Sequence, residues 1–336
     1  MSNTMKIVQI AGPDNAQWVD TPIPTLEADE VLVKVAAITT CPHWDLHILG
    51  GVSMYPGGTI DYPYIPGQPG HEMTGEVAAV GSGVDDFAVG DHVVAWRDPG
   101  QVRQGCYAQY VPFQAKNLLK IPTDLPPAAI SSLELAMCVQ VAFDQFATIT
   151  FETSTDEQGE GVSGRRFAVS GLGPAGLIAV QMARSYGARE IIAIDPLPER
   201  RAMAMELGAT KAIAPTEEEF PAGVTSEHTV DMAIDCTGLK VSIEFLLART
   251  RQNVLIFGLL REDVSFGFAQ WRSGVSLMGY GFHNRAAAER ALQLVLDGKV
   301  NLEPLATHEL PLSRYADGVA LLRTKEAIKV RFLPWA

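Results

Sequence analysis

The stretch Gly171-Leu172-Gly173-Pro174-Ala175-Gly176 follows an apolar run at residues 166–170 and precedes an apolar segment with helical spacing at residues 175–186. In such a turn between a strand and a helix, the first glycine allows a tight turn and the second lets the backbone approach a pyrophosphate. The third permits close packing of the helix on the strand. The helix N-terminus, which begins near Pro174 and Ala175, attracts phosphate. We therefore predict a dinucleotide-binding loop; the alternative is a strand-to-helix turn without a ligand.

An acidic residue, Asp195, stands about 20 residues after this loop, at the end of a predicted strand at residues 190–194. Its carboxylate would accept hydrogen bonds from ribose hydroxyls and repel a 2′-phosphate, so we expect NAD in preference to NADP. Arg200 is close enough in sequence to soften that preference. The predicted nicotinamide half of the site comprises Cys236, Thr237, Phe257 and Gly258, which end later strands; ordinary turns are an equally good interpretation of them.

Strands and helices alternate over the second half of the chain. Predicted strands at 166–170, 190–194, 231–235 and 253–257 are separated by predicted helices at 175–186, 198–207 and 241–249. This order indicates a doubly wound parallel sheet, hence an α/β fold. Up to about residue 122 the chain instead shows short β-rich segments between glycines and prolines, which predicts a barrel-like domain. A chain of 336 residues is expected to form two domains.

Composition excludes several classes of partner. The net charge of −13 argues against nucleic acid and against anionic membrane surfaces, because both need basic clusters. No apolar run is long enough to span a bilayer, and the first residues lack a signal peptide. Four scattered cysteines do not form a disulfide framework, so reduced thiols and a cytoplasmic location are expected.

A second motif in the first half suggests a metal site. Gly70-His71-Glu72 places an imidazole beside a carboxylate, and Cys41 and Glu134 offer further groups that bind zinc. Zinc would help an alcohol to lose its proton, after which hydride can pass to a nicotinamide ring. The alternatives are a buried Cys41 that only fills space and a surface position for Glu134. Cys138, in an apolar helical run, is interpreted as part of the core.

At this point the chain resembles the medium-chain dehydrogenase/reductase superfamily, on its zinc alcohol and polyol dehydrogenase side. The resemblance is carried by residues 70–84, 80–93 and 105–110 and by the nucleotide loop. It implies a GroES-like β-barrel catalytic domain at residues 1–143 and 285–336 and a Rossmann domain at residues 144–284. It also implies that His71 and Glu72 occupy the family's ligand positions and that Glu134, in Leu133-Glu134-Leu135, is the third or fourth ligand.

Two departures from the family pattern matter. Cys41-Pro42-His43-Trp44-Asp45-Leu46-His47 carries one extra residue between Cys and Asp and lacks the family's Ser/Thr proton relay. Thr40, His43 and His47 are the alternatives for that relay, and the catalytic candidates are His43, Asp45 and His47. Between Trp96 and Cys106 the cysteines of a structural zinc lobe are missing, so we expect one catalytic zinc and no structural zinc.

The resemblance implies a zinc-dependent oxidoreductase that transfers hydride between a secondary alcohol or polyol and NAD, that is, an NAD(P)-dependent alcohol dehydrogenase. Its partner would be a small-molecule alcohol or carbonyl compound, and a homodimer or homotetramer is expected. The alternative is a zinc-independent quinone or enoyl reductase that uses NAD(P)H. A third class is a nucleotide-binding protein without turnover.

Overall fold

The computed structural model describes residues 3–149, 161–223 and 228–336. It divides the chain into two compact units, of which the first comprises residues 1–135 and 301–336 and the second residues 136–300. Most of helix α3 (Leu133–Ala147) and all of α8 (Arg285–Leu296) belong to the second unit. The boundaries expected at residues 143 and 285 thus differ from those of the compact units, and they remain a prediction about the functional domains.

The second unit is built on a six-stranded parallel sheet in the order β10-β9-β8-β11-β12-β13. Its strands are β8 (Arg166–Ser170), β9 (Glu190–Ile194), β10 (Lys211–Ile213), β11 (Val230–Asp235), β12 (Thr250–Ile256) and β13 (Ser276–Gly279). The order reverses between β8 and β11, which is the switch point of a doubly wound fold. The predicted α/β class is confirmed.

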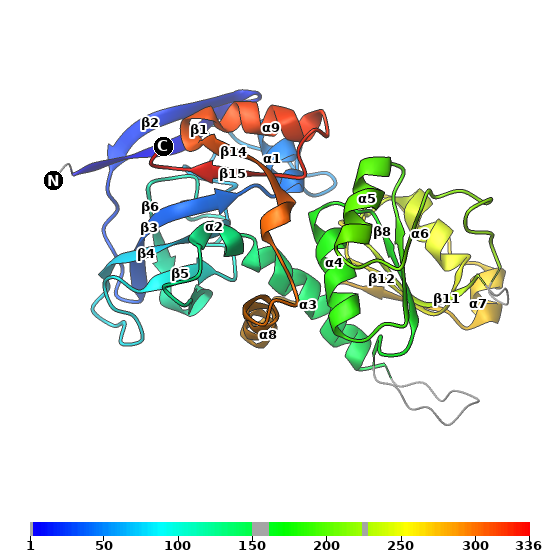
Figure 1. Cartoon of the computed structure of the whole chain (residues 1–336). Coiled ribbons are helices and arrows are strands. Elements are labelled where there is room, and N and C mark those ends of the chain that lie inside the picture. Colours follow the sequence, from blue (N-terminus) through cyan, green and yellow to red (C-terminus); the bar gives the residue numbers. More distant parts are fainter. Residues whose placement is uncertain (1–2, 150–160, 224–227) are drawn as a thin grey trace. The chain divides into compact units, whose positions relative to one another are not determined.

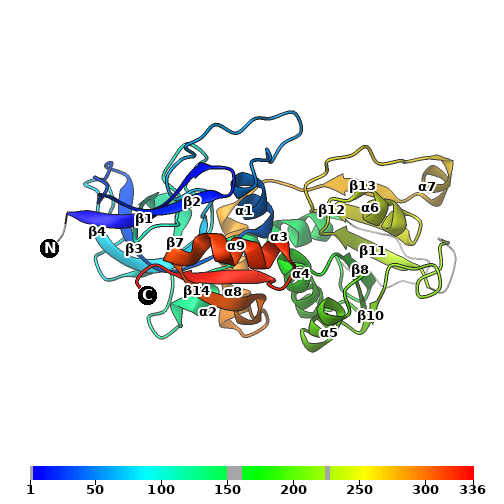
Figure 2. The same ribbon diagram turned by 90° about the horizontal axis from the view of Figure 1, so that it is seen from above.

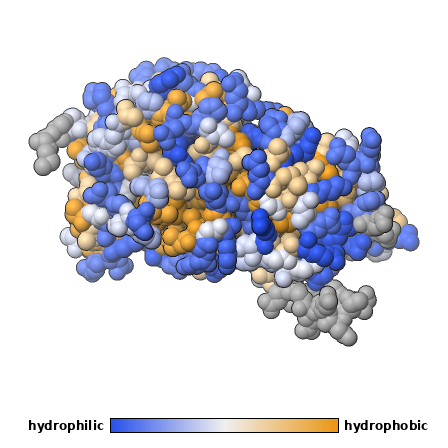
Figure 3. All heavy atoms as spheres, viewed as in Figure 1, coloured by the Kyte–Doolittle hydropathy of each residue, from blue (hydrophilic) through white to orange (hydrophobic). Residues whose placement is uncertain are grey.

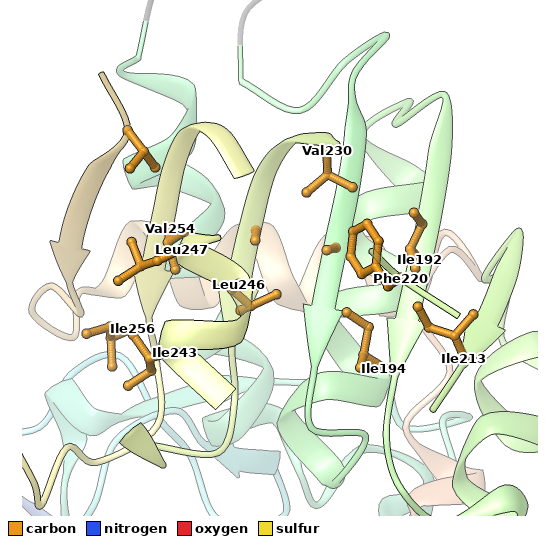
Figure 4. Packing of buried hydrophobic residues seen from close by; sticks show 13 residues of the cluster. Ile192, Ile194, Ile213, Phe220, Val230, Ile243, Leu246, Leu247, Val254 and Ile256 are labelled. Atoms are coloured by element: carbon orange, nitrogen blue, oxygen red, sulfur yellow. The ribbon is translucent and has the colours of Figure 1, made fainter. Parts of the chain in front are cut away.

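Helices cover both faces of this sheet. Figure 1 shows α4 (Pro174–Ser185) and α5 (Pro198–Glu206) against one face and α6 (Lys240–Leu247) against the other. The short α7 (Phe268–Ser273) precedes β13. Such coverage explains why these strands are continuous apolar runs rather than alternating ones. Under α6, Leu246 and Leu247 pack on isoleucines and valines of the sheet, which Figure 4 shows from close by.

The first unit is a β-rich body with a seven-stranded sheet and a separate hairpin. The sheet follows the path β14-β15-β3-β4-β5-β7, and β6 pairs with β3. Its strands are β3 (Glu30–Thr39), β4 (Glu72–Val80), β5 (His92–Ala95), β6 (Tyr110–Gln114), β7 (Leu118–Lys120), β14 (Ala306–Pro311) and β15 (Lys329–Leu333); the hairpin is β1 (Thr4–Gly12) and β2 (Asn15–Pro22).

Short helices close this unit. They are α1 (Pro42–Leu49), α2 (Pro127–Ile130), α9 (Tyr315–Arg323) and the 3-10 turns η1 (Ala115–Asn117), η2 (Glu303–Leu305) and η3 (Leu312–Arg314). In Figure 1 the red strand β15 runs beside the blue strand β3, and these strands pair antiparallel. Helix α9 packs against β14, β15 and β2 (Figure 2). The last segment of the chain therefore completes the sheet to which β3 belongs.

The face of the molecule in Figure 3 is largely hydrophilic, with smaller groups of apolar residues between the polar ones. This surface agrees with the acidic composition and the net charge of −13. Among the described residues, every helix is too short or too polar to cross a lipid bilayer.

Candidate metal centre and nucleotide loop

Three separate segments of the first unit bring the predicted metal ligands together. Cys41 immediately precedes α1, His71 immediately precedes β4, and Glu72 is the first residue of that strand. Their ligand atoms lie within 4.8 Å of one another. Glu134, near the start of α3, adds a carboxylate whose Oε2 is 3.8 Å from Nε2 of His71. The structure therefore gathers all four residues that the sequence singled out.

The orientation of the His71 ring is fixed by the backbone. Its Nδ1 lies 2.7 Å from the carbonyl oxygen of Pro69, and because a carbonyl can only accept, this nitrogen carries the hydrogen. The hydrogen bond leaves Nε2 as the nitrogen that faces Glu134. Histidines that bind metals are commonly held in this way through their second nitrogen.

The cluster attracts positive charge. Burial lowers the pKa of His71, but the hydrogen bond to Cys41 and the negative charges of Glu134, Cys41 and Glu72 raise it, and the resulting pKa lies well above the ordinary value. A proton on His71 thus partly neutralises an anionic pocket. Thiolate, imidazole and carboxylate are the donor types that zinc takes, so the residues present fit a zinc ion.

A buried ion pair balances part of this charge. Nζ of Lys329 on β15 lies 2.6 Å from both carboxylate oxygens of Glu72, and the two side chains are 0% and 1% exposed. The Thr39 hydroxyl donates to Glu72 Oε2 at 3.2 Å, and Thr39 also shares a hydrogen bond with Ser132. The sequence analysis missed Lys329. Its signal was a lysine within the apolar run 327–333, since a buried charge needs a partner.

The catalytic candidates on α1 separate into two kinds. Asp45 is fully buried and accepts hydrogen bonds from the hydroxyls of Tyr107 (2.8 Å) and Tyr315 (2.7 Å). Burial raises its pKa to about 6. A carboxylate enclosed in this way is suited to positioning α1. It is less suited to touching a substrate, which is the role that the sequence suggested for Asp45. His43 is exposed and His47 half-buried, and their ring centroids are 4.5 Å apart.

The extra residue after Cys41 is absorbed by the start of α1. Pro42 is the first residue of the helix, a position where its missing N–H leaves no bond unmade. The Asp45 N–H donates to the Cys41 carbonyl at 2.9 Å. The cysteine therefore stays at the edge of the cluster despite the insertion.

In the second unit each glycine of the loop has a distinct environment. Gly171 has φ +86°, which favours glycine, and a Cβ on Gly176 would lie 1.9 Å from the Gly171 oxygen. A Cβ on Gly173 would meet nothing within 4 Å. Pro174 and Ala175 open α4. The loop thus combines one left-handed turn that needs glycine, one close helix–strand contact and one open position where a phosphate can approach.

Asp195 braces this loop from the end of β9. Its Oδ2 accepts the Leu172 N–H at 2.8 Å and its Oδ1 accepts the Leu197 N–H at 2.9 Å. Arg200 follows in α5; burial lowers its pKa, and the charges of Asp195 and Glu199 act in the opposite direction.

The other predicted nucleotide residues lie at the same edge of the sheet. A Cβ on Gly171 would meet Thr237 Cγ2 at 2.4 Å, and one on Gly258 would meet the Gly238 nitrogen at 2.0 Å. Asp235 holds the turn that contains Cys236, because it accepts hydrogen bonds from the Thr237 hydroxyl (2.7 Å) and the Gly238 N–H (2.7 Å). The Phe257 ring packs edge-on against Tyr280. The turns after β8, β11 and β12 therefore meet at the switch point.

The parallel sheet with its glycine loop and the cysteine–histidine–glutamate cluster of the other unit define a class of protein, the zinc-type nicotinamide-dependent dehydrogenases. Comparisons with known proteins agree. Residues 27–123 match the model of the alcohol dehydrogenase GroES-like domain, and residues 174–297 match that of the zinc-binding dehydrogenases.

Relatives extend over nearly the whole chain. The L-threonine 3-dehydrogenase of Thermococcus kodakarensis is 27% identical over 99% of both chains. A zinc-binding dehydrogenase of Sinorhizobium meliloti, solved with bound NADP, is 25% identical with a TM-score of 0.84 and covers 99% of this chain and 100% of that one. Galactitol-1-phosphate dehydrogenase of Escherichia coli, 24% identical over 98% and 100% of the two chains with a TM-score of 0.81, shares the fold.

The chain belongs to the zinc-type medium-chain dehydrogenase/reductase superfamily. It is an NAD(P)-dependent oxidoreductase of the alcohol dehydrogenase type.

Proposed function

We propose that the protein is a zinc-dependent dehydrogenase that transfers hydride between a secondary alcohol or polyol-type compound and NAD. The observation that carries the proposal is the cluster of Cys41, His71 and Glu72, with ligand atoms within 4.8 Å of one another, beside the Glu134 carboxylate. Relatives named for threonine and galactitol-1-phosphate support a hydroxyl-bearing substrate.

Cys41, His71 and Glu134 would hold one zinc ion, and the carboxylate of Glu72 would be the fourth group of the cluster. When bound, zinc would make a hydroxyl more acidic and would polarise a carbonyl. Two carboxylates, one thiolate and the Lys329 ammonium leave two negative charges, which a divalent cation neutralises. Lys329 forms a buried ion pair with Glu72 and so balances part of this charge.

Proton movement falls to the two histidines of α1. An imidazole exchanges a proton near neutral pH, and His43 is exposed whereas His47 is half-buried. With their ring centroids 4.5 Å apart, these side chains would carry the alcohol proton to solvent. Asp45, held by Tyr107 and Tyr315, would position the helix that presents them.

The nucleotide would lie on the loop Gly171–Gly176. Open space at Gly173 and the N-terminus of α4 suit the pyrophosphate. Each carboxylate oxygen accepts more than one hydrogen bond, so Asp195 can brace the loop and also bind the ribose hydroxyls. This carboxylate favours NAD over NADP, and Arg200 moderates that preference. Cys236, Thr237, Phe257 and Gly258 would line the nicotinamide half.

Metal analysis and activity measurement test the proposal together. We expect one zinc per chain at the catalytic cluster, loss of alcohol oxidation on chelation, and a higher kcat/KM with NAD than with NADP. His71→Gln should lower kcat/KM by about 100-fold or more, while His308→Gln, on β14, serves as the matched control. Full alcohol oxidation by metal-free protein would contradict the metal role. Metal-free reduction of a quinone or activated alkene would favour the zinc-independent reductase.

We also propose that two copies pair through β13, either as a homodimer or within a homotetramer. This strand is an edge of the parallel sheet, and α7 beside it has no buried residue, with Phe268 and Trp271 70% and 71% exposed. Edge strands and exposed aromatic side chains are typical of self-complementary interfaces. Trp271→Glu should shift the mass measured by light scattering towards the monomer; an unchanged mass would contradict this interface.

The four free cysteines support a cytoplasmic location.

A further inference from the structure

A cysteine and a histidine of the second unit lie together outside the groups already described. Cys138, on α3, is 7% exposed, and its Sγ lies 3.4 Å from Nε2 of His283, in the segment that joins β13 to α8. The sequence analysis assigned Cys138 to the core and gave His283 no role. The contact joins residues 145 positions apart in the chain.

The spacing of the two atoms fits shared coordination. Zinc binds sulfur at about 2.3 Å and imidazole nitrogen at about 2.0–2.1 Å. With a tetrahedral angle at the metal, these bond lengths place the two ligand atoms about 3.6 Å apart. The observed 3.4 Å is close to that separation, so an ion could enter with little movement of either side chain.

The backbone around His283 is held in place. Gln145, two turns after Cys138 on α3, accepts the Gly281 N–H at 2.9 Å and donates to the Gly279 carbonyl at 3.0 Å. On the other side of His283, the Asn284 side chain caps α8 by accepting the Ala287 N–H at 2.8 Å. The segment that carries the imidazole is therefore clamped to the helix that carries the thiol. Preorganised ligands of this kind favour metal binding.

A carboxylate lies on the same side of α3. Glu134 precedes Cys138 by four residues, which puts the two side chains on one face of the helix. Because Glu134 already belongs to the Cys41–His71 cluster, the second site consists of the Cys138 thiol and the His283 imidazole. Thiolate and imidazole together select borderline or soft cations.

We propose that Cys138 and His283 form a second metal site, which takes a borderline divalent cation such as Zn²⁺ and is distinct from the Cys41–His71 cluster. Binding would release the thiol proton to solvent and leave the thiolate as ligand. The proposal goes beyond the single catalytic ion of the proposed function and does not depend on it.

Cobalt titration of the full-length, metal-stripped protein tests this site, because a cobalt–thiolate bond gives a charge-transfer absorption band. The Cys41→Ser variant removes the thiolate of the catalytic cluster. We expect this variant still to bind Co²⁺ with a thiolate band, and Cys41→Ser/Cys138→Ser to lose that band. In the Cys41→Ser background, His283→Gln should raise the dissociation constant by at least about tenfold. Cys236→Ser, which removes another thiol of the same unit, should leave the band unchanged.

Two outcomes would overturn the proposal. Either Cys41→Ser alone abolishes the thiolate band, or the double variant keeps it. Thermal unfolding of each metal-free variant checks that the substitutions leave the fold intact. Dehydrogenase activity is read separately: full activity in Cys41→Ser would count against the proposed function whatever the cobalt band shows.

Discussion

The metal cluster of the first unit and the nucleotide loop of the second are assembled in opposite ways. The loop is six consecutive residues whose properties come from the backbone: a φ of +86° at Gly171, a close approach at Gly176 and open space at Gly173. The cluster is made of charged side chains from chain segments near residues 41, 72, 134 and 329. A backbone site is sensitive to added volume, whereas a buried side-chain cluster is sensitive to changes of charge. The following predictions test that contrast, from the largest expected effect to the smallest.

Lys329→Met should have the largest effect on stability. It leaves the Glu72 carboxylate buried without its cation, and breaking such a pair costs about 3–5 kcal/mol. Calorimetric unfolding of the metal-free protein measures the loss. The matched control is Lys6→Met, which breaks the exposed pair with Asp20 and should cost at most about 1 kcal/mol. Equal costs for both variants would show that the cluster does not depend on its charge balance.

Asp45 predicts a pH dependence in the metal-free protein. Burial raises the pKa of its carboxyl from 3.8 to about 6, so the folded state keeps the proton over a range in which the unfolded chain has lost it. The free energy of unfolding of the wild type, relative to Asp45→Asn, should therefore fall by about 3 kcal/mol as pH rises from about 4 to about 6. Above about pH 6 this difference in unfolding free energy should stay constant. If the difference in unfolding free energy between wild type and Asp45→Asn rises over the same pH range, the pKa of Asp45 is not raised by folding.

Gly176→Ala tests the close contact in the backbone site. The new Cβ would lie 1.9 Å from the Gly171 oxygen, so α4 must move away from β8. Overpacking of this kind costs about 1–3 kcal/mol. Calorimetric unfolding of the variant should show this loss of stability. Calorimetric titration with NADH should show a higher dissociation constant. A variant as stable as the wild type would mean that the helix shifts without strain.

Gly173→Ala should have the smallest effect on stability. Its Cβ meets nothing within 4 Å, so the change in unfolding free energy should stay within about 0.5 kcal/mol. The methyl group would nevertheless occupy the space through which a pyrophosphate approaches, and the dissociation constant for NADH should rise by about tenfold, or about 1.4 kcal/mol. Calorimetric titration with NADH measures this dissociation constant. Unchanged affinity would place the pyrophosphate elsewhere.

The contrast also explains what the sequence could predict. The glycine spacing and the alternation of strands and helices are local, and they led to the correct fold class. The predicted helix at residues 175–186 corresponds to α4 (Pro174–Ser185). Strands β10 and β13, of three and four residues, were missed because so few residues show no clear period.

For the site, the sequence singled out residues whose chemistry is distinctive and passed over a residue whose partner is distant in the chain. Cys41, His71, Glu72 and Glu134 were chosen by donor type, and the structure brings them together. Lys329, 257 positions from Glu72, was missed, because strand pairing across the whole chain decides which buried lysine meets which carboxylate.

The position of β15 also bears on how the molecule is made. Residues 136–300 form their own compact unit, and they are synthesised before Lys329 emerges from the ribosome. At about 5–20 residues per second, the nascent barrel waits on the order of ten seconds for its final strand. During that interval the Glu72 carboxylate lacks the lysine that pairs with it in the folded protein. The nucleotide unit is thus free to fold before β15 joins the sheet of the metal-binding half.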